Sequence, residues 1–396
     1  MNKASTGLVV NPVLMLALLY FLANLASFFI LISGGDIFVD ALLMAFDGSV
    51  VYLTGAVLLV SFLSLLLLYK FCLMSFSCKK ELLLSDNWGW FLLVLQCVFW
   101  ASNSYYGVNL AGVEDLDKGN PFKIFFNFFQ PDLIYLIVAV GLVSVRLFWA
   151  NSIIFACSMV ARGWMGGVSV VFIIYFCRNY PVKLGPKLFF KLFLLFFIGV
   201  MVFPFWVELK WALRAGTSLG DVWSEVFDRG YWKSLGESLA YVLNRFQMFG
   251  HVALIAENSS VITRAYDNNE FIPYWADGLP QWFILKMNDI EVFQLNRYMV
   301  RYFFESDNLA YSTNPGVAGW LLILQEKIIF FAIFILAVII LPAFIIFKYA
   351  GRKYLLILFS LVFVYLFHGW IGAYFNFLIY MIVILFLGRI SSRNIL

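Results

Sequence analysis

The feature that most constrains this chain is a series of long apolar runs that contain no charged residue. The clearest extends from Ile328 to Phe347, and it holds no Asp, Glu, Lys or Arg. About 20 apolar residues in a helix cross the roughly 30 Å hydrocarbon core of a bilayer. Of the 396 residues, 63% are hydrophobic and 13% are charged, which excludes an ordinary soluble globular protein. The sequence predicts an all-α polytopic membrane protein.

About ten transmembrane helices are predicted from these runs and from the charged residues between them. The short runs between 131 and 178 could form two long tilted helices or three shorter ones. Three are favoured, because Arg146, Arg162 and Arg178 then lie at helix ends rather than in hydrocarbon, where each would cost at least about 2.5 kcal/mol. The predicted spans cover residues 12–33, 49–69, 88–108, 131–146, 148–162, 164–178, 188–206, 319–347, 354–369 and 371–388.

These spans divide the chain into three parts. Residues 1–206 form an N-terminal bundle of about seven spans, 207–318 a large loop domain, and 319–396 a C-terminal bundle of about three spans. With ten spans both termini lie on one side, and that side carries 14 of the 27 basic residues but two of the 23 acidic residues. The positive-inside rule therefore predicts cytoplasmic termini and a loop domain outside the membrane, in the periplasm of a Gram-negative cell.

The loop domain is predicted to be helical. A mainly apolar helix is expected over Ser234–Glu257, and a turn-rich aromatic segment over Phe271–Pro280. A long amphipathic helix is expected over Gln281–Glu305. A turn at Ser312–Gly316 then leads into the eighth span. The amphipathic helix carries a polar stripe of Glu291, Gln294, Arg297, Arg301 and Glu305.

Arginines on the predicted outer side are the main chemical signal. Arg162 follows a short span, and Arg245 interrupts an apolar helix. Arg297 and Arg301 are four residues apart, a like-charge spacing that weakens a helix unless something anionic offsets it. A guanidinium holds phosphate through a planar fork and stays charged when partly buried. The pattern indicates an anionic ligand; pairing with neighbouring glutamates or lipid headgroups is the alternative.

A proton acceptor is the second group that the sequence offers. His251 follows Arg245 by six residues, and histidine titrates near neutral pH. The loop carboxylates of Glu257, Glu305 and Asp307 are alternatives for the same role, and the sequence does not rank them. A packed histidine remains the alternative for His251.

Aromatic residues of the loop could stack on sugars. Tyr274 and Trp275 lie in the turn-rich segment, where flat rings beside polar groups suit a glycan, although packing explains them too. His368, beside Trp370 at the outer end of the ninth span, is predicted to be an interfacial histidine, and a position facing the cavity is the alternative.

No metal or disulfide framework is predicted. Asp115 and Asp117 could hold a divalent ion, but a solvated acidic loop is the favoured interpretation. The five cysteines show no CxxC or Cys/His spacing, and none falls in the outer loops. Phosphate-binding, dinucleotide-binding, zinc-protease and serine-hydrolase motifs do not occur.

In layout and in three short motifs the chain resembles the Wzy-type O-antigen and capsule repeat-unit polymerases of the O-antigen polymerase and ligase superfamily. The sequence around Arg162 is similar to the [SA]-R-[GS] step at the outer end of a mid-chain helix pair. Leu243–Phe246 looks like the loop arginine on its amphipathic helix, and Tyr311–Gly316 like the S-x-N-P-[SG] turn that closes the loop. A ligase would carry a His-Asn pair at that turn; Thr313 precedes Asn314 here, which favours a polymerase and leaves the general base unassigned.

The resemblance implies a glycosyltransferase C-like fold in the bacterial inner membrane. A growing glycan would leave undecaprenyl diphosphate and join a sugar hydroxyl of a new oligosaccharide repeat unit. Implied partners are the lipid-linked oligosaccharide and the bilayer, with a chain-length regulator and a flippase as further partners; no cofactor, metal or nucleic acid is implied. The implied diphosphate-binding residues are Arg162, Arg245, Arg297 and Arg301; the candidate catalytic residues are His251, Glu257, Glu305 and Asp307; the glycan-binding residues are Ser312, Asn314, Tyr274 and Trp275.

Two other functions remain open from the sequence. A transporter or flippase for the same lipid-linked units would place cationic residues along a central path. An O-antigen ligase would transfer the finished glycan. Spans that hold almost no acidic residues argue against an ion-coupled pump.

Overall fold

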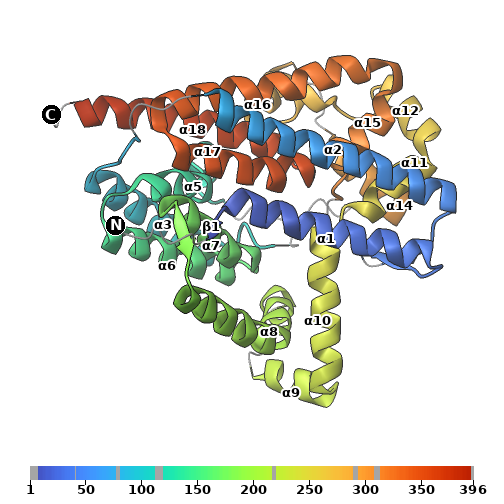
Figure 1. The fold of residues 1–396 in the computed structure, drawn as a ribbon, viewed down its shortest axis with the longest axis horizontal. Coiled ribbons are helices and arrows are strands. Elements are labelled where there is room, and N and C mark those ends of the chain that lie inside the picture. The colour runs from blue at the N-terminus through green and yellow to red at the C-terminus, as the bar shows by residue number, and fades with distance from the viewer. Residues whose placement is uncertain are drawn as a thin grey trace, which may run out of the picture. The chain divides into compact units, whose positions relative to one another are not determined.

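The computed structural model describes residues 8–40, 42–76, 81–111, 119–215, 220–288, 293–306 and 313–393. Helices dominate these residues (Figure 1). The strands among them form two small antiparallel sheets. In one, β1 (Leu8–Val10) pairs with β4 (Val182–Leu184); the other is a hairpin of β2 (Ile37–Val39) and β3 (Leu42–Met44). The predicted helical fold class is confirmed.

Five helical stretches in the described residues are long and apolar enough to cross a membrane. Three shorter apolar helices are α5 (Pro131–Gly141), α6 (Val145–Ala161) and α7 (Gly166–Arg178). The predicted count of about ten spans is therefore not confirmed. The five stretches are α1 (Pro12–Ile32), α2 (Gly48–Ser75), Pro186–Leu213 of α8 (Pro186–Ala215), Gly316–Ala350 and Ile371–Ser391 of α18 (Ile371–Arg393).

The chain forms two compact units. Unit 1 contains Met1–Met15, Leu83–Val242 and Ile390–Leu396; unit 2 contains Leu16–Leu82 and Leu243–Arg389. The boundary at Val242 lies inside the loop domain 207–318 that the sequence predicts. The first part of that loop belongs to unit 1, and the rest belongs to unit 2.

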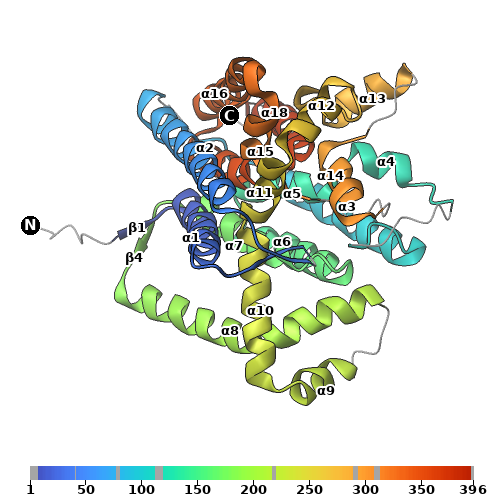
Figure 2. The same cartoon turned by 90° about the vertical axis from the view of Figure 1, so that its right-hand side faces the viewer.

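Unit 1 is built on α3 (Asp86–Tyr106), which packs against α5 and α6. The preference for three helices between 131 and 178 is confirmed. Arg146 is the second residue of α6, Arg162 is its C-cap and Arg178 ends α7, so each cation reaches a helix end. Pro204 lies inside α8, and Figure 2 shows this helix bending partway along, with α9 (Asp221–Asp228) beside its second half.

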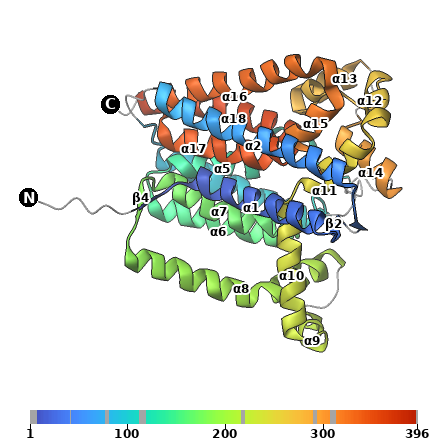
Figure 3. The same cartoon turned by 45° about the vertical axis from the view of Figure 1, so that its right-hand side comes forward.

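Unit 2 combines long apolar helices with the later part of the loop. Figure 1 shows α2, α16 (Ile328–Ala350) and α18 running side by side. Figure 3 shows α11 (Phe249–Glu257), α12 (Ser259–Asp267) and α14 (Leu295–Phe304) at the end of this bundle where α2 begins. The core contains α15 (Gly316–Leu324), α17 (Arg352–Leu361) and a π-helix at Val362–Phe367.

Two predicted loop helices are wrong, because both are interrupted. The helix expected over Ser234–Glu257 is divided into α10 (Tyr231–Phe246) and α11. The side chain of Gln247 accepts a hydrogen bond from Gly250 N at 2.9 Å and so starts a new helix.

The helix expected over Gln281–Glu305 is divided into α13 (Leu279–Met287) and α14. Asn288 donates its side-chain amide back to Ile284 O at 2.8 Å, which closes α13. Ile272 N then donates a hydrogen bond to Phe293 O at 2.8 Å. This bond ties the residues before α14 to the segment before α13, so α14 does not continue α13. The polar stripe is not continuous, and Glu291 lies outside the described residues.

Candidate functional site

The candidate site is organised around the segment His368–Gly372, which runs from the end of the π-helix into the first turn of α18. A side chain at Gly369, whose φ is 120°, would lie 2.6 Å from Gly316 N and 3.1 Å from the backbone carbon of Asn314. A side chain at Gly372 would collide with the carboxylate of Asp277. Two glycines therefore let this segment contact both the Asn314 turn and the Asp277 segment of unit 2.

A buried histidine–aspartate pair lies in the same unit. His251 on α11 is 3% exposed, and its Nε2 is 2.7 Å from Asp40 Oδ2. Asp40 is at the turn of the β2–β3 hairpin with φ 54°, and Gln247 holds that hairpin by donating to Phe38 O at 3.0 Å. The other ring nitrogen, His251 Nδ1, is buried and has no hydrogen-bond partner. If Nε2 carries the proton toward Asp40, Nδ1 presents a free lone pair, as in a histidine general base.

The second histidine of the chain approaches this pair. His368 is buried, and its Nδ1 is 3.3 Å from the hydroxyl of Tyr20 on α1. His368 is also close enough to sense the charges of His251, Arg245 and Asp40. Segments far apart in the sequence thus gather two imidazoles, a carboxylate and a guanidinium in one region.

Asp277 is a second half-buried carboxylate of unit 2, after Asp40. Its Oδ1 accepts from Gln294 Nε2 at 2.7 Å, and its Oδ2 accepts from Gly372 N at 2.9 Å, in the first turn of α18. A helix N-terminus stabilises a negative charge at this place. Burial nevertheless raises the pKa of Asp277, while Gln294, the amides of Gly372 and Gly278 and the charge of Arg297 act in the opposite direction.

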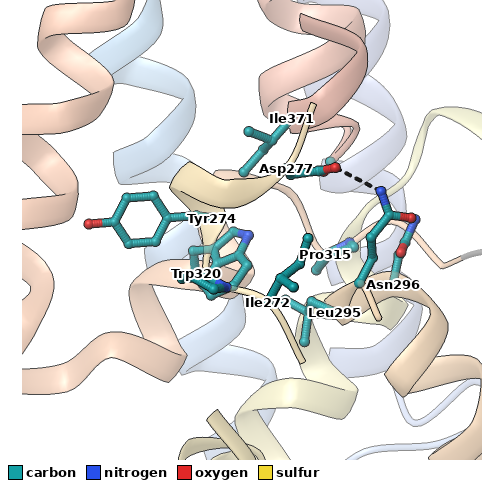
Figure 4. A pocket seen from close by; sticks show the side chains of 11 residues that line it. Ile272, Tyr274, Asp277, Leu295, Asn296, Pro315, Trp320 and Ile371 are labelled. Carbon is teal, nitrogen blue, oxygen red and sulfur yellow. Dashed lines mark hydrogen bonds between the residues drawn. The ribbon is translucent and has the colours of Figure 1, made fainter. Parts of the chain in front are cut away.

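A small pocket, with about 20 Å³ of space for water-sized molecules, lies beside Asp277. Figure 4 shows Asp277 at one edge of it, and the dashed line marks the 2.7 Å hydrogen bond that Asp277 accepts from Gln294. Tyr274 and Trp320 contribute rings that meet edge to face at 5.6 Å. The remaining lining residues are Ile272, Pro273, Leu295, Asn296, Pro315, Gly369 and Ile371.

Several residues singled out in the sequence belong to this region. Arg245 and His251 accompany the first polar cluster, and Arg297 lies near Asp277. Tyr274 lines the pocket. Asn314 is 6% exposed, and its Oδ1 has no hydrogen-bond partner. Within the described residues no carboxylate lies in salt-bridge distance of Arg297.

Other predicted site residues lie apart from it. Glu257 is exposed at the end of α11, and Glu305 is exposed at the C-cap of α14 with φ 48°. Arg301 is exposed and lies 5.8 Å from the centre of the Phe293 ring. Trp275 is 54% exposed and does not line the pocket. The predictions for Asp307, Ser312, Asp115 and Asp117 lie outside the described residues.

Arg162 belongs to unit 1 and already has an acidic partner. One of its terminal nitrogens is 2.8 and 3.0 Å from the two oxygens of Asp132 in the first turn of α5. Its guanidinium also lies over the Phe99 ring at 4.9 Å. The carboxylate of Asp132, 30 residues earlier in the chain, therefore already offsets the charge of Arg162.

Sequence reasoning did not assign roles to Asp40, Tyr20, Asp132, Asp277 or Gln294. One signal was present, since Asp40 and Asp132 each directly precede an apolar run. Tyr20 gave no signal, because it stands inside an apolar run. Among the described ranges, no three His, Cys, Asp or Glu side chains gather closely enough to hold a metal ion.

Comparison of the chain with protein-family models, with curated proteins and with solved structures found no match.

Proposed function

We propose that this chain is a membrane glycosyltransferase that polymerises oligosaccharide repeat units linked to an isoprenyl diphosphate. The observation that carries the proposal is the buried His251–Asp40 pair in unit 2, with the free Nδ1 of His251 and with Arg245 and His368 in electrostatic range. The family resemblance supplies the substrate class. The histidine–carboxylate pair, the nearby cations and the apolar helices beneath them are the parts that such a reaction requires.

The reaction begins with proton transfer from the acceptor. A sugar hydroxyl of the new repeat unit gives its proton to Nδ1 of His251, and Asp40 stabilises the imidazolium that forms. The acceptor oxygen forms a bond to the anomeric carbon of the growing glycan. At the same time the bond from that carbon to the diphosphate oxygen breaks, and the electron pair leaves with the diphosphate.

Cations stabilise the leaving group as it gains charge. Arg245 and Arg297 are the guanidinium groups of unit 2 that accompany the two polar clusters. Fixed positive charges aimed at a developing anion form a large part of catalysis in sites that exclude water. In this proposal Arg162 does not hold the leaving diphosphate, because its charge is offset by Asp132.

The proposal also sets the orientation in the membrane. Both termini are cytoplasmic and the site faces the periplasm of a bacterial inner membrane, as the distribution of basic residues predicts. At that face an isoprenyl tail remains in the bilayer while its sugars reach the polar ends of the helices.

The test uses the purified full-length chain in lipid nanodiscs with short lipid-linked repeat units and no nucleotide sugar. Elongation of the glycan is followed by gel or mass spectrometry. The wild type lengthens the units, and His251→Gln and Arg245→Ala do not. Arg264→Ala removes an exposed arginine of α12 and serves as the matched control that retains elongation.

Two outcomes would overturn the proposal. One is full elongation by both the His251→Gln and the Arg245→Ala variants at wild-type protein levels. The other is a wild type that moves fluorescent lipid-linked units across a bilayer without lengthening them, which would make the chain a transporter.

A further inference from the structure

Unit 1 contains its own set of buried polar side chains, which the proposed function does not use. They lie on three apolar helices that pack together, α3, α5 and α6. Each is at most 6% exposed. The set comprises Gln96, Ser102 and Asn103 on α3, Tyr135 on α5, and Asn151, Ser152, Ser158 and Arg162 on α6.

Many of these groups have no hydrogen-bond partner among the described residues. Both side-chain atoms of the Gln96 amide are unpartnered, as are Asn103 Nδ2 and Asn151 Oδ1. The hydroxyls of Ser102 and Ser158 are unpartnered as well. A buried polar atom without a partner is costly, and more so where hydrocarbon rather than water surrounds the helices. A concentration of such atoms in one helix bundle calls for a ligand that satisfies them.

The members of the set on α6 lie along one side of that helix. Asn151, Phe155, Ser158 and Arg162 are three or four residues apart, so they share one face of α6. At one end the Asn151 amide donates to Gly89 O of α3 at 3.1 Å. The distance along α6 from Asn151 to Arg162 is about 16 Å.

Contacts between the helices connect the middle and the far end of the set. The Tyr135 hydroxyl is 2.8 Å from Ser152 Oγ, and its ring stacks on Phe155 at 4.1 Å. At the far end Arg162 meets Asp132 of α5 and the Phe99 ring of α3. We call the whole set, from Asn151 to the Asp132–Arg162 pair, the polar column.

We infer that the polar column binds water molecules inside the α3–α5–α6 bundle. The unpartnered atoms include acceptors, such as Gln96 Oε1 and Asn151 Oδ1, and donors, such as Gln96 Nε2 and Asn103 Nδ2. Water satisfies both kinds, whereas a metal cation satisfies oxygen acceptors alone. Arg162 repels a cation, and Asp132 neutralises the charge that would attract an anion.

The bound water gives the Asp132–Arg162 pair a polar environment within an apolar bundle. In this inference the water molecules bind the unpartnered atoms of Gln96, Ser158 and Asn103, on the helices that carry or contact Arg162. The inference concerns unit 1 alone and does not depend on the glycosyltransferase proposal.

Radiolytic labelling tests the inference. Hydroxyl radicals formed in nanodiscs by an X-ray pulse arise wherever water is present, including buried water, and they oxidise the nearest side chains. Tyr135 and Phe155 are at most 1% exposed, yet we expect severalfold more oxidation there than at Tyr374 and Phe359, which are equally buried in unit 2. After exchange into H₂¹⁸O the oxygen added to Tyr135 carries ¹⁸O.

A variant pair makes the test specific. Gln96→Leu removes both unpartnered amide atoms and should lower the oxidation of Tyr135 and Phe155 to the level of the buried controls. Thr54→Val removes another buried unpartnered hydroxyl, on α2 in unit 2, and should leave that oxidation unchanged. Asn151→Leu supplies the same readout if the Gln96 variant does not fold. Equal labelling of Tyr135 and Tyr374 in the wild type, or no effect of either column variant, would show that the column is dry.

Discussion

At the scale of single residues, the proposed function depends most on how His251 is held. Asp40 contacts Nε2 at 2.7 Å and leaves Nδ1 free. The carboxylate therefore sets which ring nitrogen carries the proton, and it would stabilise a charged ring. Asp40 acts as a positioning residue, because it reaches a substrate only through His251.

The variant Asp40→Asn is expected to lower glycan elongation by about 10²- to 10⁴-fold, the range of general acid–base contributions. The amide can donate a hydrogen bond to Nε2, so the proton moves to Nδ1, the atom that should accept one. Elongation rates measured against pH, beside thermal melting of the same variant, separate this effect from misfolding. A rate and pH profile like those of the wild type would contradict it.

Gly372 is expected to tolerate no side chain. Gly372→Ala places a methyl group against the Asp277 carboxylate and should cost about 1–3 kcal/mol, as overpacking does. Gly236→Ala on α10 is the matched control, because nothing lies within 4 Å of its added methyl group; it should be neutral or stabilising by up to about 1 kcal/mol. Denaturation midpoints of both variants in the same detergent provide the comparison.

Asp277 gives a residue-level pH prediction. Its folded-state pKa is raised by burial, so the folded chain binds this proton more tightly than the unfolded chain does. Its contribution to stability is complete below its usual pKa of about 3.9 and is lost as the pH rises through the higher folded value.

The reference is the variant Asp277→Asn, because an asparagine side chain has no carboxyl group to titrate. The melting temperature of the wild type relative to this variant should fall as the pH is raised from the acid range. A difference that stays constant with pH, or that grows in favour of the wild type, would contradict the direction of the shift.

At the scale of elements, side-chain amides decide where the helices end and how they join. Asn24 of α1 accepts from Met248 N at 2.8 Å and donates to Phe246 O at 3.3 Å, which links α1 to the break between α10 and α11. Gln247 completes that break through Gly250 N. These polar contacts explain why an apolar pattern that continues through 247 does not produce one helix.

The variant Asn24→Leu is expected to destabilise unit 2 by about 1–3 kcal/mol, because it leaves a buried backbone N–H without its acceptor. Asn288→Ala removes an exposed side-chain hydrogen bond to Ile284 O and should change stability by no more than about 0.5 kcal/mol. Hydrogen–deuterium exchange at Met248 should rise in the first variant alone. Unchanged protection at Met248 would remove the proposed link between α1 and α11.

At the scale of the whole molecule, the long apolar helices indicate that lipid surrounds much of the protein. Residues Pro186–Leu213 of α8 contain a strongly apolar 18-residue stretch, yet only 6% of that stretch is buried within the protein. Such a helix is stable where its sides meet hydrocarbon, since its backbone hydrogen bonds are satisfied internally. The distribution of basic residues predicts the orientation of such a chain in the bilayer.

The orientation is testable with reporter fusions. Green fluorescent protein fused after residue 396 should fluoresce, because the terminus is expected in the cytoplasm, and alkaline phosphatase inserted after Gly230 should be active, because the loop is expected outside. The exchanged fusions, phosphatase at the terminus and fluorescent protein in the loop, should be inactive. The opposite pattern would invert the proposed topology and exclude a site facing the periplasm.

The sequence by itself determined the membrane class, the helical content and the positions of Arg146, Arg162 and Arg178 at helix ends. Those features follow from local hydropathy, because the cost of a charge in hydrocarbon applies to each residue where it stands. It also pointed to Arg245 and His251, since a polar residue inside an apolar pattern needs a partner.

Only the tertiary structure decided which partners these residues have. Asp40 contacts His251, which lies 211 residues later in the sequence, and Asp132 contacts Arg162, which lies 30 residues later. The breaks at Gln247 and Asn288 likewise depend on side-chain hydrogen bonds that hydropathy does not register. Hydropathy records how each residue partitions between water and lipid, whereas a hydrogen bond depends on which groups meet once distant helices pack, and packing is a property of the folded chain.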